Sequence, residues 1–125
     1  MMFIYYTKEG KSTSVFYNDM PFNKLHRENG PAIKWPDGKK EWWVDGKRHR
    51  LDGPAIEHSS GTKKWYVNGK RHRLSGPAIE YDNGNASWYI NGGKLNTKKV
   101  EAWIKDNNIN LKTKEHQVLF MLKFG

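Results

Sequence analysis

One four-residue phrase occurs three times in this chain at a constant spacing. Gly-Pro-Ala-Ile begins at Gly30, Gly53 and Gly76, so successive copies lie 23 residues apart. A fixed period of this length is the sequence signature of a repeat protein. Each unit of such a protein is stabilised by its neighbours rather than by a core of its own. The period therefore limits the fold to a stack of small, similar units.

Other residue types keep the same step and extend the repeat over the middle of the chain. They are expected to hold structural positions that recur in every copy. The residues that keep the 23-residue step are His26, His49 and His72; Trp42, Trp65 and Trp88; and Gly46, Gly69 and Gly92.

Each copy predicts a β-hairpin followed by a connection. A short strand follows each Gly-Pro (residues 32–35, 55–58 and 78–81), and a glycine-containing turn comes next. The second strand carries the aromatic pair (42–44, 65–67, 88–90) and ends in Asp-Gly or Asn-Gly, which favours a tight turn with positive φ. The predicted fold is mainly β (α+β): an antiparallel meander of repeated hairpins in an elongated single-layer sheet.

The two ends of the chain depart from the repeat. Residues 2–18 predict an opening hairpin, and residues 1–25 are interpreted as a degenerate first copy of a repeat sheet spanning residues 1–94. Residues 95–125 predict two short helices packed on the sheet, over its last edge or one of its faces. The expected caps are Asn96 or Thr97 and then Thr113; the expected apolar faces are Val100, Trp103 and Ile104, and Val118, Leu119 and Leu122.

Charge and composition narrow the class of partner. The formal net charge is +9 and aromatic residues make up 14% of the chain. This balance favours an anionic partner, with a merely solvated basic surface as the alternative. There is no cysteine, the first eight residues do not resemble a signal peptide, and no apolar run approaches a membrane span. These features predict a cytoplasmic protein with no membrane partner.

The repeat resembles a known family. Paired aromatics, Asn-Gly turns and a downstream glycine at a 23-residue period resemble the MORN and MORN-like repeats, which are stacked β-hairpins. The stretch from Trp65 to Glu80 and the C-terminal segments Val100–Lys105 and Gln117–Phe120 are similar to a variant common in hypothetical proteins of tailed bacteriophages. The resemblance covers roughly residues 22–125 and implies a phage-type origin. For such a protein the cytoplasm would be that of the host cell.

The His-Arg elements have two interpretations. In the first, the basic residues form an anion-binding ladder along one edge, offering Lys24 and the candidate partner-binding residues Lys47, Arg48, Arg50, Lys70, Arg71 and Arg73. In the second, histidine forms a hydrogen bond to a backbone carbonyl of the connection, and arginine pairs with glutamate or carbonyl oxygens. We expect the structural role for His26, His49 and His72, and partner contact from Arg48 and Arg71.

The aromatic pairs predict two rows on opposite faces, because side chains alternate along a strand. We assign Trp42, Trp65 and Trp88 to the packed face. We assign Trp43, Tyr66 and Tyr89 to the face that meets a partner, where rings stack bases or anchor a protein interface.

Catalytic chemistry is not predicted. The sequence holds no Gly-x-Ser-x-Gly, P-loop or His-Glu-x-x-His motif. Glu57 and Glu80 are interpreted as cross-strand charge pairs. The in-phase histidines would lie too far apart to ligate one metal ion. We therefore expect neither enzyme activity nor a cofactor or metal.

Three functional hypotheses remain. The first is a phage-type protein that binds and inhibits a host protein, possibly one of anti-phage defence, through a basic and aromatic face. The second is nucleic-acid binding by the same face. The third is a structural protein or one that pairs edge to edge with its own copies, and the sequence leaves monomer and oligomer open.

Overall fold

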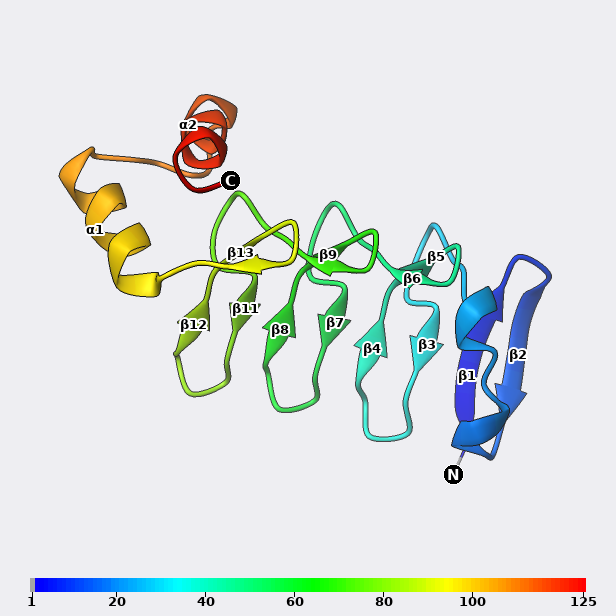
Figure 1. The fold of residues 1–125 in the computed structure, drawn as a ribbon. Helices are drawn as coiled ribbons and strands as arrows, with labels where there is room; N and C mark the ends of the chain where they lie inside the picture. Colours follow the sequence, from blue (N-terminus) through cyan, green and yellow to red (C-terminus); the bar gives the residue numbers. More distant parts are fainter. Residues whose placement is uncertain (1) are drawn as a thin grey trace.

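The computed structural model describes residues 2–125; Met1, the first residue of the predicted repeat domain, lies outside them. The described chain is an elongated row of β-hairpins with two helices at its C-terminal end (Figure 1). All strand pairs within it are antiparallel. The predicted fold class, mainly β with a C-terminal pair of helices, is confirmed.

Eight strands form one large sheet that runs the length of the repeats. Its order is β2-β1-β3-β4-β7-β8-β11-β12, so from β3 onward neighbours follow the order of the chain. The opening hairpin enters with β1 against β3, which leaves β2 at the edge. The strands are β1 (Phe3–Thr7), β2 (Gly10–Ser14), β3 (Ile33–Lys34), β4 (Lys40–Glu41), β7 (Ile56–Glu57), β8 (Lys63–Lys64), β11 (Ile79–Glu80) and β12 (Ala86–Ser87).

A second, smaller hairpin follows each of the three repeat hairpins of the large sheet (β3–β4, β7–β8 and β11–β12). Pairing in the large sheet ends at Glu41 rather than continuing through the aromatic pair, and the tight turn then folds the chain back at once. The predicted second strand is therefore divided, and each predicted connection begins with a strand. The small hairpins are β5 (Trp43–Val44) with β6 (Lys47–Arg48), β9 (Tyr66–Val67) with β10 (Lys70–Arg71), and β13 (Tyr89–Ile90) with β14 (Gly93–Lys94).

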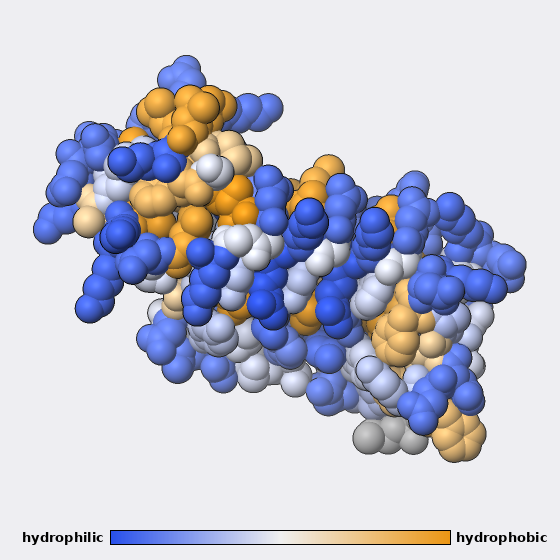
Figure 2. Space-filling model, in the orientation of Figure 1, coloured by the Kyte–Doolittle hydropathy of each residue, from blue (hydrophilic) through white to orange (hydrophobic). Residues whose placement is uncertain are grey.

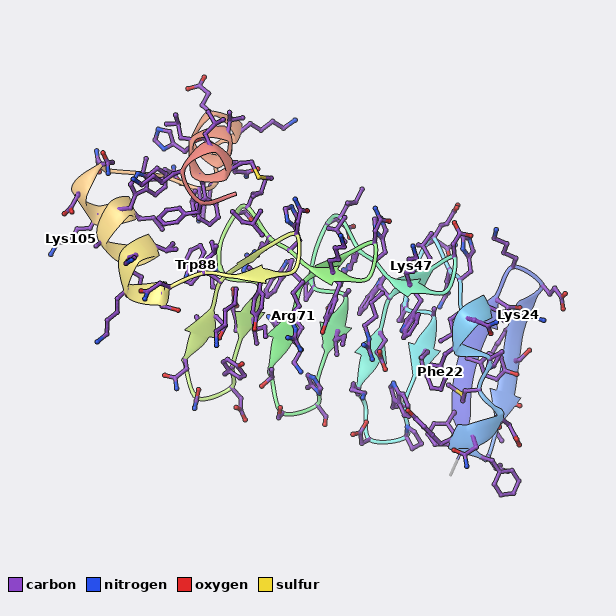
Figure 3. All side chains as sticks on the ribbon, in the orientation of Figure 1. Phe22, Lys24, Lys47, Arg71, Trp88 and Lys105 are labelled. Carbon is purple, nitrogen blue, oxygen red and sulfur yellow. The ribbon has the colours of Figure 1, made fainter. Side chains whose placement is uncertain are left out.

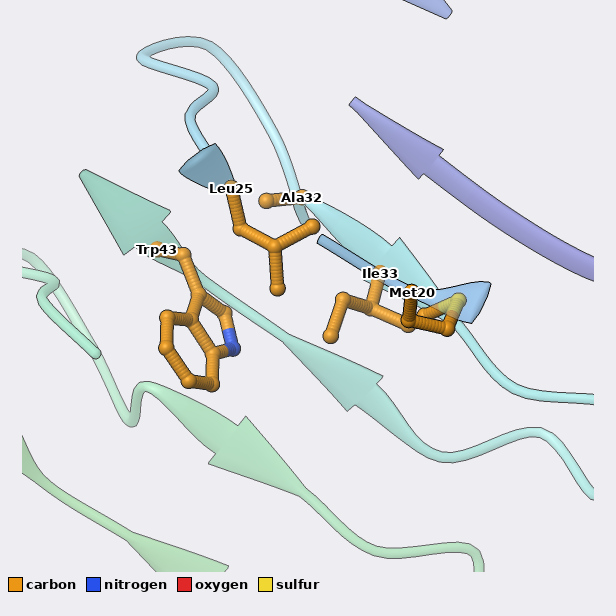
Figure 4. Close-up of a cluster of buried hydrophobic side chains, with 5 residues drawn as sticks. All are labelled: Met20, Leu25, Ala32, Ile33 and Trp43. Atoms are coloured by element: carbon orange, nitrogen blue, oxygen red, sulfur yellow. The ribbon is translucent and has the colours of Figure 1, made fainter. Parts of the chain in front are cut away.

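The core lies between the large sheet and the row of small hairpins, so the repeats form two layers rather than the single layer predicted. Ile33 and Ala32 are fully buried and cluster with Trp43 from β5, together with Met20 and Leu25 (Figure 4). Ala55 and Ile56 form the same contact with Tyr66 in the next copy. The first two copies thus each bury one aromatic ring on a few aliphatic side chains, which explains how a chain of low mean hydropathy, −0.94, forms a core.

Two 3₁₀ turns, Tyr17–Asp19 and Phe22–Lys24, join the opening hairpin to the repeats. Phe16 and Tyr17, interpreted as the first aromatic pair, are exposed there. Met20, in phase with Trp43, is the buried residue instead.

The helices close the C-terminal end of the small-hairpin row. They are α1 (Thr97–Asp106) and α2 (Lys114–Phe124), and the predicted caps are confirmed: Asn96 Oδ1 accepts from the Lys99 amide, and Thr113 Oγ1 from the His116 amide. They pack beside β13 rather than along β12, the last strand of the large sheet (Figure 1). Neither helix has both the length and the apolar character to cross a membrane.

The packed face of α2 differs from the predicted one. Phe120 is fully buried, and Met121 and Phe124 pack with it against α1 and the last repeat. The prediction that Val118, Leu119 and Leu122 pack inward is wrong, since all three are exposed. Figure 2 shows apolar side chains gathered over α2 on the surface of the molecule. The face of α2 that carries Phe120 points inward, and the Phe120 ring meets that of Trp88 at a centroid distance of 5.6 Å.

Candidate binding surface

Arginines and aromatic rings alternate between the small hairpins and the large sheet. The Arg48 guanidinium carbon lies 5.1 Å from the ring centroid of Trp43 and 5.6 Å from that of Tyr66. The Arg71 carbon lies 5.9 Å from Tyr66 and 5.3 Å from Tyr89. We call these five residues the cation–aromatic ladder. Arg71 lies between β9 and the strands of the large sheet (Figure 3), and hydrophilic and paler bands alternate across this region in Figure 2.

The structure contradicts the predicted partner-facing role of Trp43 and Tyr66, whereas Trp88 is buried as predicted. Trp43 and Tyr66, expected to meet a partner, are only 8% and 7% exposed, while Tyr89 is half-buried. They face the core because the small hairpins turn them onto the buried isoleucines. The other row is Trp42, Trp65 and Trp88. Arginines cover the first two rings, and the C-terminal helices pack on the third.

Trp42 and Trp65 are each covered by an arginine of the same copy. The guanidinium carbon of Arg50 lies 3.9 Å from a Trp42 ring centroid, and that of Arg73 lies 3.7 Å from Trp65. The Nη1 atoms of these arginines donate to the Pro54 and Pro77 carbonyls and to carboxylates of Glu57 and Glu80. Arg50 and Arg73 therefore serve the fold, as the second interpretation of the His-Arg element expects.

The histidines are structural in each copy, with the direction of the bond reversed from the expected one. Nδ1 accepts from a backbone amide of the next turn, so it carries no proton. The pairs are His26 with Asp45 (3.0 Å), His49 with Asn68 (3.0 Å) and His72 with Asn91 (2.9 Å).

The predicted lysines lie on a different side of the molecule from the ladder. Lys47 and Lys70 precede Arg48 and Arg71 by one residue, so they point to the opposite face of their hairpins. Both are exposed, and their aliphatic stems cross Gly69 and Gly92. The structure therefore separates the six predicted cations: Arg48 and Arg71 in the ladder, Lys47 and Lys70 outside, Arg50 and Arg73 within the connections.

In the first regular copy a buried carboxylate neutralises the ladder. Glu41 is 1% exposed and accepts from Trp35 Nε1 at 2.6 Å, Trp43 Nε1 at 3.2 Å and Arg48 Nε at 2.9 Å. The Lys39 ammonium approaches it at 3.8 Å. Arg48, predicted to contact a partner, is thus occupied inside the chain.

The second copy has the opposite charge at this place. Lys64 stands 23 residues after Glu41, and like Glu41 it faces the buried isoleucines across the sheet. Arg71 Nε donates to the Tyr66 hydroxyl at 3.2 Å, which raises the pKa of Arg71. Among the ion pairs of residues 2–125, none includes Arg71 or Lys64. This copy therefore carries two cations without an internal acid.

His58 belongs to the same group of residues, and one of its ring nitrogens lacks a hydrogen bond. Its Nε2 is buried and has no hydrogen-bond partner within the described residues. Burial, with the nearby ammonium groups of Lys64 and Lys39, lowers the pKa of His58. We define the open basic site by four residues: His58, Lys64, Tyr66 and Arg71.

The sequence held a signal for this site that the aromatic and His-Arg rows obscured. Glu41, Lys64 and Ser87 occupy one repeat position with three different charges, whereas most of the repeated positions keep their type. Glu57 and Glu80, expected as cross-strand charge pairs, do lie opposite Lys63 in the register, and they also bind Arg50 and Arg73.

Several surface hollows of the described residues are lined by residues outside the ladder, at the opening hairpin, between the two helices and in the connections. One of about 790 Å³ lies between successive connections and is lined by Trp42, His49, Arg50, Leu51 and Asp52, among others. Within residues 2–125 no three His, Asp or Glu side chains are placed to hold a metal ion. No family model, curated protein or solved structure matches the chain.

Proposed function

We propose that this is a non-enzymatic, phage-type binding protein that engages and blocks a host protein through its basic and aromatic repeat face. The observation that carries the proposal is that Lys64 and Arg71 occupy the repeat positions at which Glu41 and Arg48 pair in the first copy, and that neither has an acid partner among residues 2–125 in a protein of net charge +9. Leaving two cations unpaired has a cost for folding, and a negatively charged partner would offset it.

Protein is favoured over nucleic acid as the partner at this face. A single-strand binder needs exposed rings on which bases stack. Trp43 and Tyr66 are buried, so their rings are not open to stacking. A carboxylate of an acidic protein surface needs positive charge and hydrogen-bond donors rather than an open ring face.

Nucleic-acid binding is the second candidate, and a different surface favours it. Lys24, Lys47 and Lys70 are exposed at a 23-residue step, as a row of phosphate contacts would be. A gel-shift titration at two salt concentrations tests this candidate. If this candidate is right, the affinity for nucleic acid should fall steeply as salt rises. The double variant Lys47→Ser, Lys70→Ser should show a weaker dependence on salt.

Affinity capture from bacterial lysate, with nuclease treatment in parallel, tests the leading proposal. The wild-type chain should retain a stoichiometric acidic protein after nuclease treatment, and Arg71→Ser should lose it. Lys47→Ser is the matched control, since it removes one charge from the outer side of the neighbouring hairpin. Absence of any stoichiometric protein, or equal loss with both variants, would reject the proposal.

A further inference from the structure

Two successive copies of the repeat place the same donors around different centres. In the first copy, the indoles of Trp35 and Trp43 and the guanidinium of Arg48 all donate to the Glu41 carboxylate. One period later the corresponding residues are His58, Tyr66, Arg71 and, at the place of the acid, Lys64. The second copy thus keeps the donors and has exchanged the acceptor for a further cation.

Each of these donors has capacity left. The His58 Nε2 is buried without a partner. The Tyr66 hydroxyl accepts from Arg71, so its own proton remains to be donated. Arg71 donates from Nε to Tyr66, and the outer nitrogens of its planar fork are suited to a carboxylate.

We propose that the open basic site binds a carboxylate of an acidic peptide segment, in the manner in which the first copy binds its own Glu41. The ligand's carboxylate lies between the Lys64 ammonium, the Arg71 fork and the Tyr66 hydroxyl, with His58 Nε2 donating from beneath. This inference rests on the proposed function, because it names the chemical group that the partner contributes.

A carboxylate fits this site better than a phosphate. The three donors that surround Glu41 come from flat groups, two indoles and one guanidinium, and they meet both oxygens of one planar carboxylate. Tyr89 flanks Arg71 on the far side, with its ring centroid 5.3 Å from the guanidinium carbon. A phosphate would bring additional charged oxygens into a space bordered by rings.

One substitution converts the open copy into the closed one. Lys64→Glu supplies the carboxylate that the donors lack, so it should raise the melting temperature of the full chain and abolish peptide binding. Lys47→Glu makes the same change of charge on the exposed outer side. It should leave both properties near those of the wild type.

Titration of the ¹⁵N-labelled full chain with tetraglutamate, followed by NMR, tests the site directly. We expect shifts of the His58 imidazole and the Arg71 side chain, an increase in the pKa of His58, and at least tenfold weaker binding by Lys64→Glu. Unchanged His58 and Arg71 signals, a lower melting temperature for Lys64→Glu, or tighter binding of a phosphate oligomer than of tetraglutamate would each overturn the inference.

The outcomes separate this inference from the proposed function. If Lys64→Glu still captures the host protein while tetraglutamate does not bind, the carboxylate site is rejected and the binding function stands. If tetraglutamate binds as expected while lysate yields no protein, the site stands and the host-protein function is rejected.

Discussion

Arg50 and Gly53 act together, and the same unit recurs in each copy. The guanidinium lies flat between the Trp42 ring and the glycine, and a Cβ placed on Gly53 would stand 2.9 Å from the Arg50 guanidinium carbon. The glycine of each Gly-Pro-Ala phrase is therefore required by close approach of an arginine, since it has no positive φ. The two most conspicuous motifs in the sequence therefore contact each other: the arginine of the His-Arg element packs on the glycine of the Gly-Pro-Ala phrase.

Gly53→Ala should lower the free energy of unfolding by about 1–3 kcal/mol, because the methyl group displaces the guanidinium from the Trp42 ring and the Pro54 carbonyl. Urea unfolding measures the change. In an Arg50→Ala background the same substitution should cost much less. An equal cost in both backgrounds would show that the glycine is needed for another reason.

Acid should destabilise the fold through two histidines. Burial lowers the pKa of His72, and burial with Lys64 and Lys39 lowers that of His58. The unfolded chain then takes up protons first, near pH 6.5, so the stability these residues contribute is complete above that pH and declines as pH falls below it. Unfolding between pH 5.5 and 7.5 should show this slope, and His58→Gln with His72→Gln should reduce it. Stability that stays flat or rises on acidification would contradict the assignment.

At the level of the element, the tight turn determines the second layer. Asp45 and Gly46 both have positive φ, 51° and 74°, as the hairpin turn with two left-handed residues requires. The turn's sequence predicted this backbone correctly. Its consequence was not predicted, because the returning strand Lys47–Arg48 has only two charged residues and no β propensity.

The three turns differ in how tightly they are enclosed. A Cβ on Gly46 would lie 2.3 Å from the Asn23 carbonyl oxygen, whereas one on Gly92 would meet only the stem of Lys70, at 3.7 Å. Both glycines have similar positive φ, so alanine costs about 1–2 kcal/mol at either from backbone strain alone. Gly46→Ala should cost roughly 2 kcal/mol more than Gly92→Ala, because a backbone atom must move. Equal losses by chemical unfolding would show that the Asn23 segment yields freely.

The sequence did not predict which face of each strand or helix is buried. Alternation along a strand says that Trp42 and Trp43 point in opposite directions, and it does not say which direction is covered. The answer depends on the small hairpins, which turn Trp43 onto Ile33. For α2 the pattern offered Val118, Leu119 and Leu122 as one face, and the ring of Phe120 outside that face packs instead. Of the open basic site, Tyr66 and Arg71 were among the predicted partner contacts, whereas His58 and Lys64 were missed, since Lys64 is significant only beside Arg71.

At the level of the whole molecule, the C-terminal helices replace the arginine of a missing copy. The position 23 residues after Arg73 is Asn96, which caps α1 and leaves Trp88 uncovered. Phe120 from α2 then covers that ring, with an interplanar angle of 79°. The stack thus ends where a cation–aromatic contact is exchanged for an aromatic pair.

Phe120→Ala should destabilise the whole chain by about 3–5 kcal/mol, since Phe120 is fully buried among Trp88, Trp103 and Phe124. Leu122→Ala, on the same helix and 77% exposed, should change stability by no more than about 0.5 kcal/mol. Thermal unfolding of both variants measures the difference. Similar losses would mean that the outer face of α2 is covered in solution.

The contacts that join the copies give the chain a fixed unit of length. His26, His49 and His72 each accept a hydrogen bond from a turn 19 residues ahead in the chain. The glycine amides of these turns donate back to the carbonyls of Leu25, Arg48 and Arg71. Duplicating or deleting 23 residues keeps all these partners matched, whereas a change of any other size misaligns them. Such a gene can therefore grow or shrink by whole copies through recombination, and each new copy can be neutral or open according to one codon, the one that encodes glutamate in the first copy and lysine in the second.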